Sequence, residues 1–140
     1  MRVLVIDDEP DVLLLCRVNF EIAGHEVLEA LDGEHGLDLA FAQVPDVIVL
    51  DVMLPSRDGL SVLGELQGDD RTRGTPVILL TAKTQTQDRR AGWEAGCSEY
   101  VTKPFSPVAL ARTVDRVVGT PPAERLARRD RELARLAADA

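Results

Sequence analysis

Short, unbroken apolar runs recur along the chain, and polar residues bound each of them. The three clearest runs are Val3–Ile6, Val47–Leu50 and Val77–Leu80. Runs of this length, rich in β-branched residues, are typical of strands that are buried on both faces of a parallel sheet. Two weaker runs, at 26–30 and 99–102, predict the second and the fifth strand.

Segments with apolar side chains at helical spacing lie between these runs. Pro10 opens the first segment and Gly24 ends it, as expected of a helix start and stop. Further helices are predicted around 37–41, 60–66, 86–95 and 107–118. Five strand–helix alternations predict an α/β fold with helices on both faces of a five-stranded parallel sheet. We expect the flavodoxin-like strand order 2-1-3-4-5.

The end of the chain is a different kind of segment. Pro121 and Pro122 break the fifth helix, so we predict a domain over 1–120 and a C-terminal helical tail over 121–140. The tail is rich in strong helix formers, and Leu126, Leu133 and Leu136 mark an apolar stripe that Arg129 interrupts. Two interpretations stay open: a solvated or lightly docked helix, or a helix that dimerises or binds a partner.

Charge and composition exclude several classes of protein. Acidic residues outnumber basic ones by 24 to 16, giving a net charge of −8, whereas neutralising phosphate backbones needs a basic face. Acidic residues also interrupt the arginines of the tail, which offers no aromatic ring for base stacking. We therefore expect no direct nucleic-acid binding.

Isolated cysteines and histidines give no sign of a metal site. Cys16 and Cys97 lack zinc-ligand spacing and are expected to be idle reduced thiols, and His25 and His35 are expected at the surface. The first apolar run is too short for a signal peptide or a membrane span. We expect a cytoplasmic protein with no membrane insertion.

The candidate chemistry follows the predicted strands. Asp7 and Asp8 follow the first run, Asp51 the third strand, Thr81 the fourth, and Lys103 the fifth. The carboxyl ends of parallel strands meet at one edge of a sheet, which is where sites form in open α/β folds. Three carboxylates there would repel one another, and Mg²⁺ with oxygen ligands would relieve that repulsion.

Such a site is suited to accepting a phosphoryl group. Asp51, alone after the central strand, is the natural nucleophile and would form an aspartyl phosphate. Lys103 and a metal would neutralise the phosphoryl oxygens. Thr81 could donate a hydrogen bond to them, and the backbone amide of Ala82 could help.

The ordered set of motifs resembles the receiver domain of two-component response regulators over residues 1 to about 118. The motifs are Asp7-Asp8-Glu9, Asp51, Leu54-Pro55-Ser56-Arg57-Asp58-Gly59, Thr81-Ala82 and Lys103-Pro104-Phe105. The resemblance implies that Asp51 is the phosphoacceptor and that a histidine kinase or phosphotransfer protein is the donor.

The resemblance also implies how the site works. Asp8, Asp51 and the backbone carbonyl of Met53 would hold Mg²⁺ directly, and Asp7 would reach it through water. Lys103 would bind the phosphoryl group, and the peptide bond before the next proline is often cis in the family. Under this interpretation the protein is not an enzyme and catalyses only its own phosphorylation and dephosphorylation.

A switch would connect the site to a partner. By resemblance, Thr81 swings toward the phosphoryl group and Tyr100 turns inward behind it, although the residues alone would leave Tyr100 as plain core. The signalling face is then formed by the fourth helix, fifth strand and fifth helix. It would contact a downstream partner or output domain, and a homodimer is a further possibility.

Two other interpretations compete. The chain could be the N-terminal receiver of a longer regulator with an output domain after residue 140. An aspartyl-nucleophile phosphatase is the enzyme alternative, but such enzymes place a second acid where this chain has Met53.

Overall fold

The predicted strands form one parallel sheet in the order β2-β1-β3-β4-β5, in the computed structural model, which describes residues 1–139. The strands are β1 (Arg2–Ile6), β2 (Glu26–Ala30), β3 (Val47–Leu50), β4 (Val77–Thr81) and β5 (Glu99–Thr102). Both the fold class and the strand order expected from the alternation of apolar runs are confirmed.

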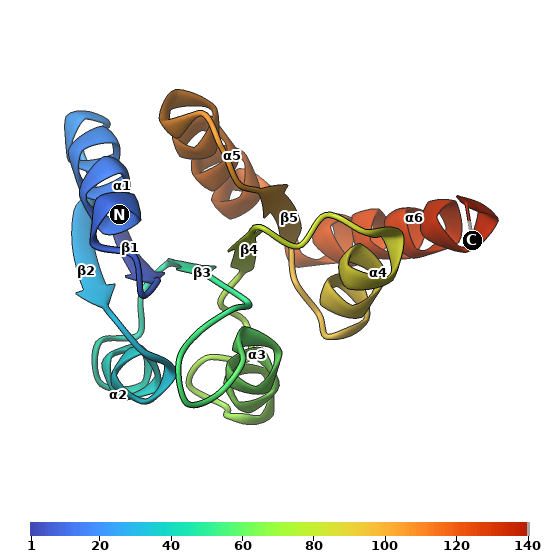
Figure 1. Ribbon diagram of the computed structural model, residues 1–140, viewed down its shortest axis with the longest axis horizontal. Helices are drawn as coiled ribbons and strands as arrows, with labels where there is room; N and C mark the ends of the chain where they lie inside the picture. The colour runs from blue at the N-terminus through green and yellow to red at the C-terminus, as the bar shows by residue number, and fades with distance from the viewer. Residues whose placement is uncertain (140) are drawn as a thin grey trace.

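Helices cover both faces of this sheet. They are α1 (Pro10–Ile22), α2 (Gly33–Gln43), α3 (Gly59–Gly68), α4 (Thr86–Glu94), α5 (Pro107–Gly119) and α6 (Pro122–Asp139). Figure 1 shows α1 and α5 on one face and α2 and α3 on the other, with α4 beside β5. Over residues 1–139, none of the helices combines the length and the apolar character that a membrane span needs.

The central strands supply both halves of the core. Successive side chains of a strand point to opposite faces, so Val3 and Val5 pack under α1 and α5 while Leu4 and Ile6 pack toward α2 and α3. All of these side chains are fully buried. This two-sided burial is why the runs are continuous rather than alternating in the sequence.

Isolated polar residues behave as expected, with one exception. Cys16 and Cys97 are buried free thiols, and burial raises the pKa of both, which disfavours the reactive thiolate. His35 is exposed. The expectation of a surface position for His25 is wrong, because its side chain is only 9% exposed and its Nε2 lies 2.9 Å from Asp115 Oδ1.

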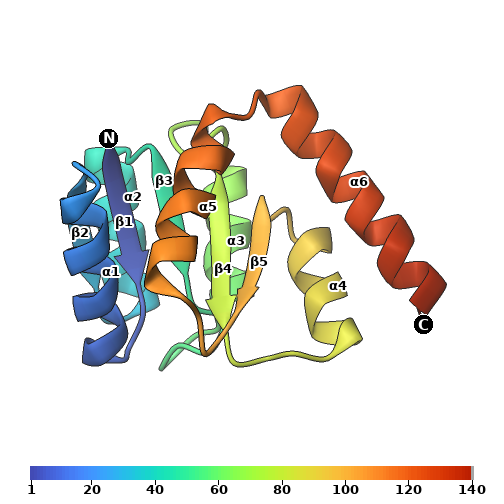
Figure 2. The same cartoon turned by 90° about the horizontal axis from the view of Figure 1, so that it is seen from above.

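The tail is a helix that docks on the rest of the chain. Figures 1 and 2 show α6 leaving the end of α5 and lying along α4, at the β5 side of the sheet. Leu136 is 2% exposed and belongs to the same apolar cluster as Trp93 of α4. Of the two interpretations of the tail, docking is the one observed up to Asp139, and partner binding stays a prediction; Ala140 lies outside the described residues.

Candidate functional site

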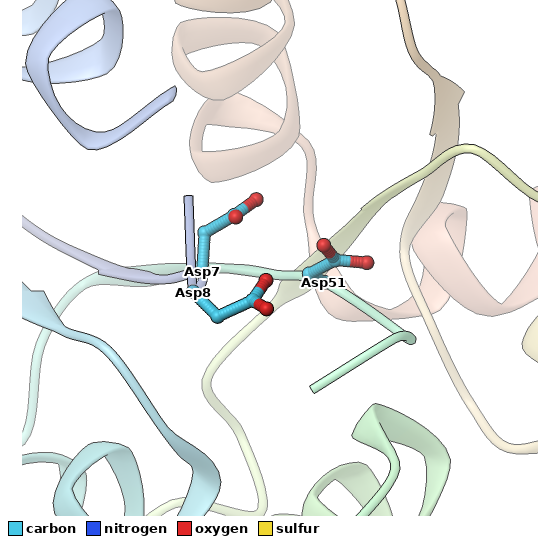
Figure 3. Close-up of side chains that lie close together, drawn as sticks. All are labelled: Asp7, Asp8 and Asp51. Atoms are coloured by element: carbon cyan, nitrogen blue, oxygen red, sulfur yellow. The ribbon is translucent and has the colours of Figure 1, made fainter. Parts of the chain in front are cut away.

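The strand ends bring the predicted acids together. Ile6 pairs with Leu50 in the sheet register, so Asp7 and Asp8 leave β1 beside the point where Asp51 leaves β3. Carboxylate oxygens of these three aspartates lie within 4.8 Å of one another. Figure 3 shows the three side chains gathered at this edge. Asp7 and Asp51 are buried, whereas Asp8 is exposed to solvent.

Lys103 directly follows the last residue of β5, and its side chain reaches into the cluster. Its Nζ lies 2.9 Å from Asp7 Oδ2, 2.9 Å from Asp51 Oδ2 and 3.3 Å from Glu9 Oε2. Burial alone would lower the pKa of Lys103, but the hydrogen bonds and charges of Asp51 and Asp7 outweigh it and raise the pKa above its usual value. The lysine is therefore a permanent cation, and acids outnumber it.

The surroundings of Asp7 disfavour its ionised form. Its side chain is 1% exposed, and burial is the main cause that raises its pKa, with the charge of Asp51 adding to the effect. Its Oδ1 accepts a hydrogen bond from the Glu9 amide at 2.9 Å. Its buried Oδ2 accepts no well-directed hydrogen bond from the described residues, although the Lys103 ammonium lies beside it.

The loop after β3 is folded tightly around Asp51. The Met53 amide donates to Asp51 Oδ1 at 2.9 Å, which orients the carboxylate. The Gly59 amide donates to the Val52 carbonyl at 2.7 Å, and a Cβ at Gly59 would lie 2.1 Å from the Asp51 carbonyl oxygen. Only glycine fits this approach. Asp58 then caps α3 by accepting from the Ser61 amide.

Thr81 and Tyr100 are linked through one backbone segment. Tyr100 is buried with its ring turned inward, and its hydroxyl donates to the Lys83 carbonyl at 2.8 Å. The Lys83 amide in turn donates to Thr81 Oγ1 at 3.3 Å. Burial raises the pKa of Tyr100 to about 12, so the hydroxyl keeps its proton at neutral pH and acts as a donor.

The Lys103 loop continues this edge of the sheet. Its backbone amide donates to the Thr81 carbonyl at 2.8 Å, and the bond between Lys103 and Pro104 is cis. Ala82 and Met53 lie at the rim with exposed side chains. Their backbone roles toward a phosphoryl group and a metal stay predictions.

Comparison with known proteins identifies the family. The family model for the response regulator receiver domain matches residues 3–115. The chain belongs to this family. Receivers are the phosphorylated modules of two-component signal transduction, which agrees with the resemblance found in the sequence.

Known receivers and regulators resemble this chain in sequence and in structure. The protein named DNA-binding dual master transcriptional regulator RpaA, from Synechocystis sp., is 43% identical over 123 residues, which cover 83% of this chain and 51% of RpaA. The alkaline phosphatase synthesis transcriptional regulatory protein PhoP of Bacillus subtilis is 43% identical over 106 residues, covering 76% of this chain and 43% of PhoP. This receiver therefore spans about half the length of these curated relatives.

A solved structure shows the same architecture. The chemotaxis response regulator CheY4 of Vibrio cholerae superposes with a TM-score of 0.79 at 30% identity, and the match covers 83% of this chain and 97% of CheY4.

The expectation of no nucleic-acid binding applies to residues 1–140. The relative RpaA is named a DNA-binding regulator, and the matched part covers only 51% of RpaA.

The acidic cluster fits a hard divalent cation. Three carboxylates offer oxygen ligands, and the buried Asp7 Oδ2 has spare acceptor capacity within the described part of the chain. Asp8 also borders an open hollow of about 440 Å³ that Met53 and Asp58 line. Mg²⁺ prefers sites with few carboxylate ligands and with space for several bound water molecules.

Two features of this receiver were missed by the sequence reasoning. The motif Asp7-Asp8-Glu9 predicts no role for Glu9, although Glu9 contacts Lys103. The position of Glu9 beside two aspartates is a signal that points to the site. The second feature is Glu99, a buried carboxylate in β5 that pairs with Arg116 and Arg128. A charged residue inside a predicted strand was its only signal.

Proposed function

We propose that this receiver accepts a phosphoryl group on Asp51 with the help of Mg²⁺. The observation that supports this proposal best is the position of Lys103 Nζ, 2.9 Å from an oxygen of both Asp7 and Asp51. An ammonium held there can contact the phosphoryl group as soon as it is bonded to Asp51. The neighbouring acids keep that ammonium charged.

The expected donor is a phosphohistidine of a kinase or a phosphotransfer protein. A carboxylate oxygen of Asp51 attacks the phosphorus, and the new O–P bond forms while the P–N bond of the donor breaks. The electron pair of that bond stays on the imidazole nitrogen. The hydrogen bond from the Met53 amide orients Asp51. After transfer, the Lys103 ammonium would pair with the negatively charged phosphoryl oxygens.

Asp7, Asp8 and Asp51 are the residues that would hold Mg²⁺, together with the Met53 carbonyl. Bound Mg²⁺ would neutralise phosphoryl oxygens and lower the repulsion among the three carboxylates. Thr81 would donate its hydroxyl to the phosphoryl group, beside the Ala82 amide. Because the Lys83 backbone is hydrogen-bonded to both Thr81 and Tyr100, a movement of Thr81 would change the position of the tyrosine.

We further propose that the chain catalyses only its own phosphorylation and dephosphorylation. An aspartyl-nucleophile phosphatase needs a second acid near the nucleophile to protonate the leaving group. The residue two positions after Asp51 is Met53, whose half-exposed thioether cannot serve as that acid.

Labelling with acetyl phosphate tests this function. With Mg²⁺, the wild type should gain one phosphoryl group that is labile in both acid and base, measured by intact mass. Asp51→Asn should gain none. Asp38→Asn is the matched control, because Asp38 is an exposed aspartate on α2, and it should be labelled like the wild type. Full labelling of Asp51→Asn would refute the assignment.

A longer protein is the second candidate context. The curated relatives are about twice as long as the matched region and are named transcriptional regulators. In such a protein, this receiver would control an output domain that follows it. The sequence of the complete reading frame would distinguish the two contexts.

A further inference from the structure

The C-terminal helix α6 binds the region of the domain that lies behind Tyr100. Its inward-facing positions recur at helical spacing, with arginines in the first half and leucines in the second. Leu133 and Leu136 join the apolar cluster that contains Trp93 and Tyr100. Figure 2 shows α6 lying alongside α4.

Arg129 joins α6 to the end of α4. Its Nε donates to the Trp93 carbonyl at 2.8 Å, and its Nη2 donates to the Glu94 carbonyl at 3.2 Å. These carbonyls belong to the last turn of α4, where a cation interacts favourably with the helix dipole. The residue that interrupts the leucine stripe is therefore the one that fastens the helix.

Arg128 joins α6 to β5. Its Nη2 and Nε donate to the two carboxylate oxygens of Glu99 at 2.9 and 3.0 Å, and its guanidinium lies 5.7 Å from the centroid of the Trp93 ring. Glu99 is 8% exposed. Burial alone would raise the pKa of Glu99, but Arg128 and Arg116 outweigh it and lower the pKa. A buried carboxylate of this kind needs such partners.

Both attachment points adjoin Tyr100. Glu99 precedes it in β5, and Gly92, which precedes Trp93 in α4, faces its ring. A Cβ at Gly92 would lie 2.8 Å from Tyr100 Cδ2, so α4 and the inward ring are already in close contact. α6 is therefore attached both to α4, which contacts the Tyr100 ring, and to β5, which carries Tyr100.

We propose that docking of α6 stabilises the inward position of Tyr100, so that α6 docking and phosphorylation of Asp51 favour each other. The coupling to phosphorylation rests on the proposed function, whereas the docking of α6 is independent of it. It follows that α6 covers part of the α4 and β5 surface in the phosphorylated state. It also follows that the helix is not an inhibitor released by phosphorylation.

Linkage makes the coupling measurable from both ends, because two sites that affect each other do so by the same factor. The first measurement is hydrogen exchange of the α6 amides in the 140-residue chain, with Mg²⁺ alone and with Mg²⁺ plus beryllofluoride, which mimics a phosphoryl group on a carboxylate. We expect beryllofluoride to slow exchange in α6 by about fivefold or more. Unchanged or faster exchange, with beryllofluoride bound, would overturn the proposal.

The second measurement uses the arginines. The double variant Arg128→Gln and Arg129→Gln should exchange faster in α6 and bind beryllofluoride more weakly, by at most the factor by which beryllofluoride slows α6 exchange in the wild type. Arg131→Gln is the matched control, because Arg131 is exposed on the same helix. Equal beryllofluoride affinity in the double variant and the wild type would contradict the coupling. Arg129→Gln alone, which leaves Glu99 paired, covers the case in which the double variant misfolds.

The remaining outcomes separate the two proposals. If beryllofluoride does not bind and acetyl phosphate does not label the wild type, the proposed function fails, and with it the coupling. Faster α6 exchange in the arginine variants would then still support docking. Sedimentation should give a monomer; a dimer whose dissociation on dilution frees α6 would overturn docking within one chain.

Discussion

Removing the charge of Asp7 should stabilise the protein in the absence of Mg²⁺. Three carboxylates lie within 4.8 Å of one another, and Lys103 Nζ lies 2.9 Å from Asp7. At an effective dielectric constant of about 20, the repulsion between Asp7 and the buried Asp51 costs about 3.5 kcal/mol, and the attraction to Lys103 contributes about 6 kcal/mol. Solvent screens the exposed Asp8. The raised pKa of Asp7 shows that the cost of burying its charge, together with the Asp51 repulsion, outweighs this attraction.

Asp7→Asn removes this cost and keeps the local geometry, since its amide oxygen can still accept the Glu9 hydrogen bond. We expect the free energy of unfolding to rise by about 1–2 kcal/mol at pH 7, which corresponds to an increase of about 4–8 °C in Tm. Mg²⁺ at 100 times its Kd should stabilise the wild type by about 2.7 kcal/mol. It should stabilise the variant much less, because a ligand is gone.

The pH dependence has a definite sign. The pKa of Asp7 is higher in the folded than in the unfolded state, so folding disfavours its ionised form. The destabilisation is absent below the unfolded pKa and grows as the pH rises toward the folded pKa. The difference in Tm between Asp7→Asn and the wild type should therefore vanish in acid and grow as the pH rises.

Thermal unfolding by circular dichroism, with and without Mg²⁺, measures both effects. Asp38→Asn serves as the control for the substitution itself and should leave Tm unchanged in both conditions. A Tm of Asp7→Asn equal to or below that of the wild type at pH 7 without Mg²⁺ would refute the electrostatic reasoning.

Three further substitutions test the switch and the tail. Thr81→Ala should still be labelled by acetyl phosphate but lose the change in fluorescence of the single tryptophan on phosphorylation; an unchanged response would contradict the switch role. Gly92→Ala should lower the free energy of unfolding by about 1–3 kcal/mol, because the new methyl group would collide with the Tyr100 ring. Gly64→Ala is the control, because open space surrounds that position, and it should raise the free energy of unfolding by up to about 1 kcal/mol. Leu136→Ala should cost about 2–5 kcal/mol in denaturant unfolding, and a smaller loss would show that α6 is only loosely packed.

The sheet and the acidic site were predictable because their signals are local. A strand buried on both faces must be apolar at every position, so the runs mark it directly. In a parallel sheet the residue after each such run lies at the same edge, so Asp7, Asp51 and Lys103 could be brought together before any distance was known. The resemblance to receivers then attached expected roles to these positions.

The tail and the histidine were not predictable in the same way. Arg129 looked like a defect in an apolar stripe, but it binds carbonyls 35 and 36 positions away in the sequence. The sequence predicts a surface position for His25 after a turn, but its side chain is largely buried, and its Nε2 pairs with Asp115 at a separation of 90 positions. Long polar side chains find partners that no spacing rule encodes.

Local pattern thus decided the element types, their order and the acids that share one edge, because burial and strand direction act on each segment separately. Tertiary structure decided the rest: the ion pairs of Lys103, the raised pKa of Asp7, the inward position of Tyr100 and the docking of α6. Each of these depends on distances between atoms from different segments, and Coulomb and hydrogen-bond energies change steeply over a few ångströms. Those distances exist only once the chain is folded.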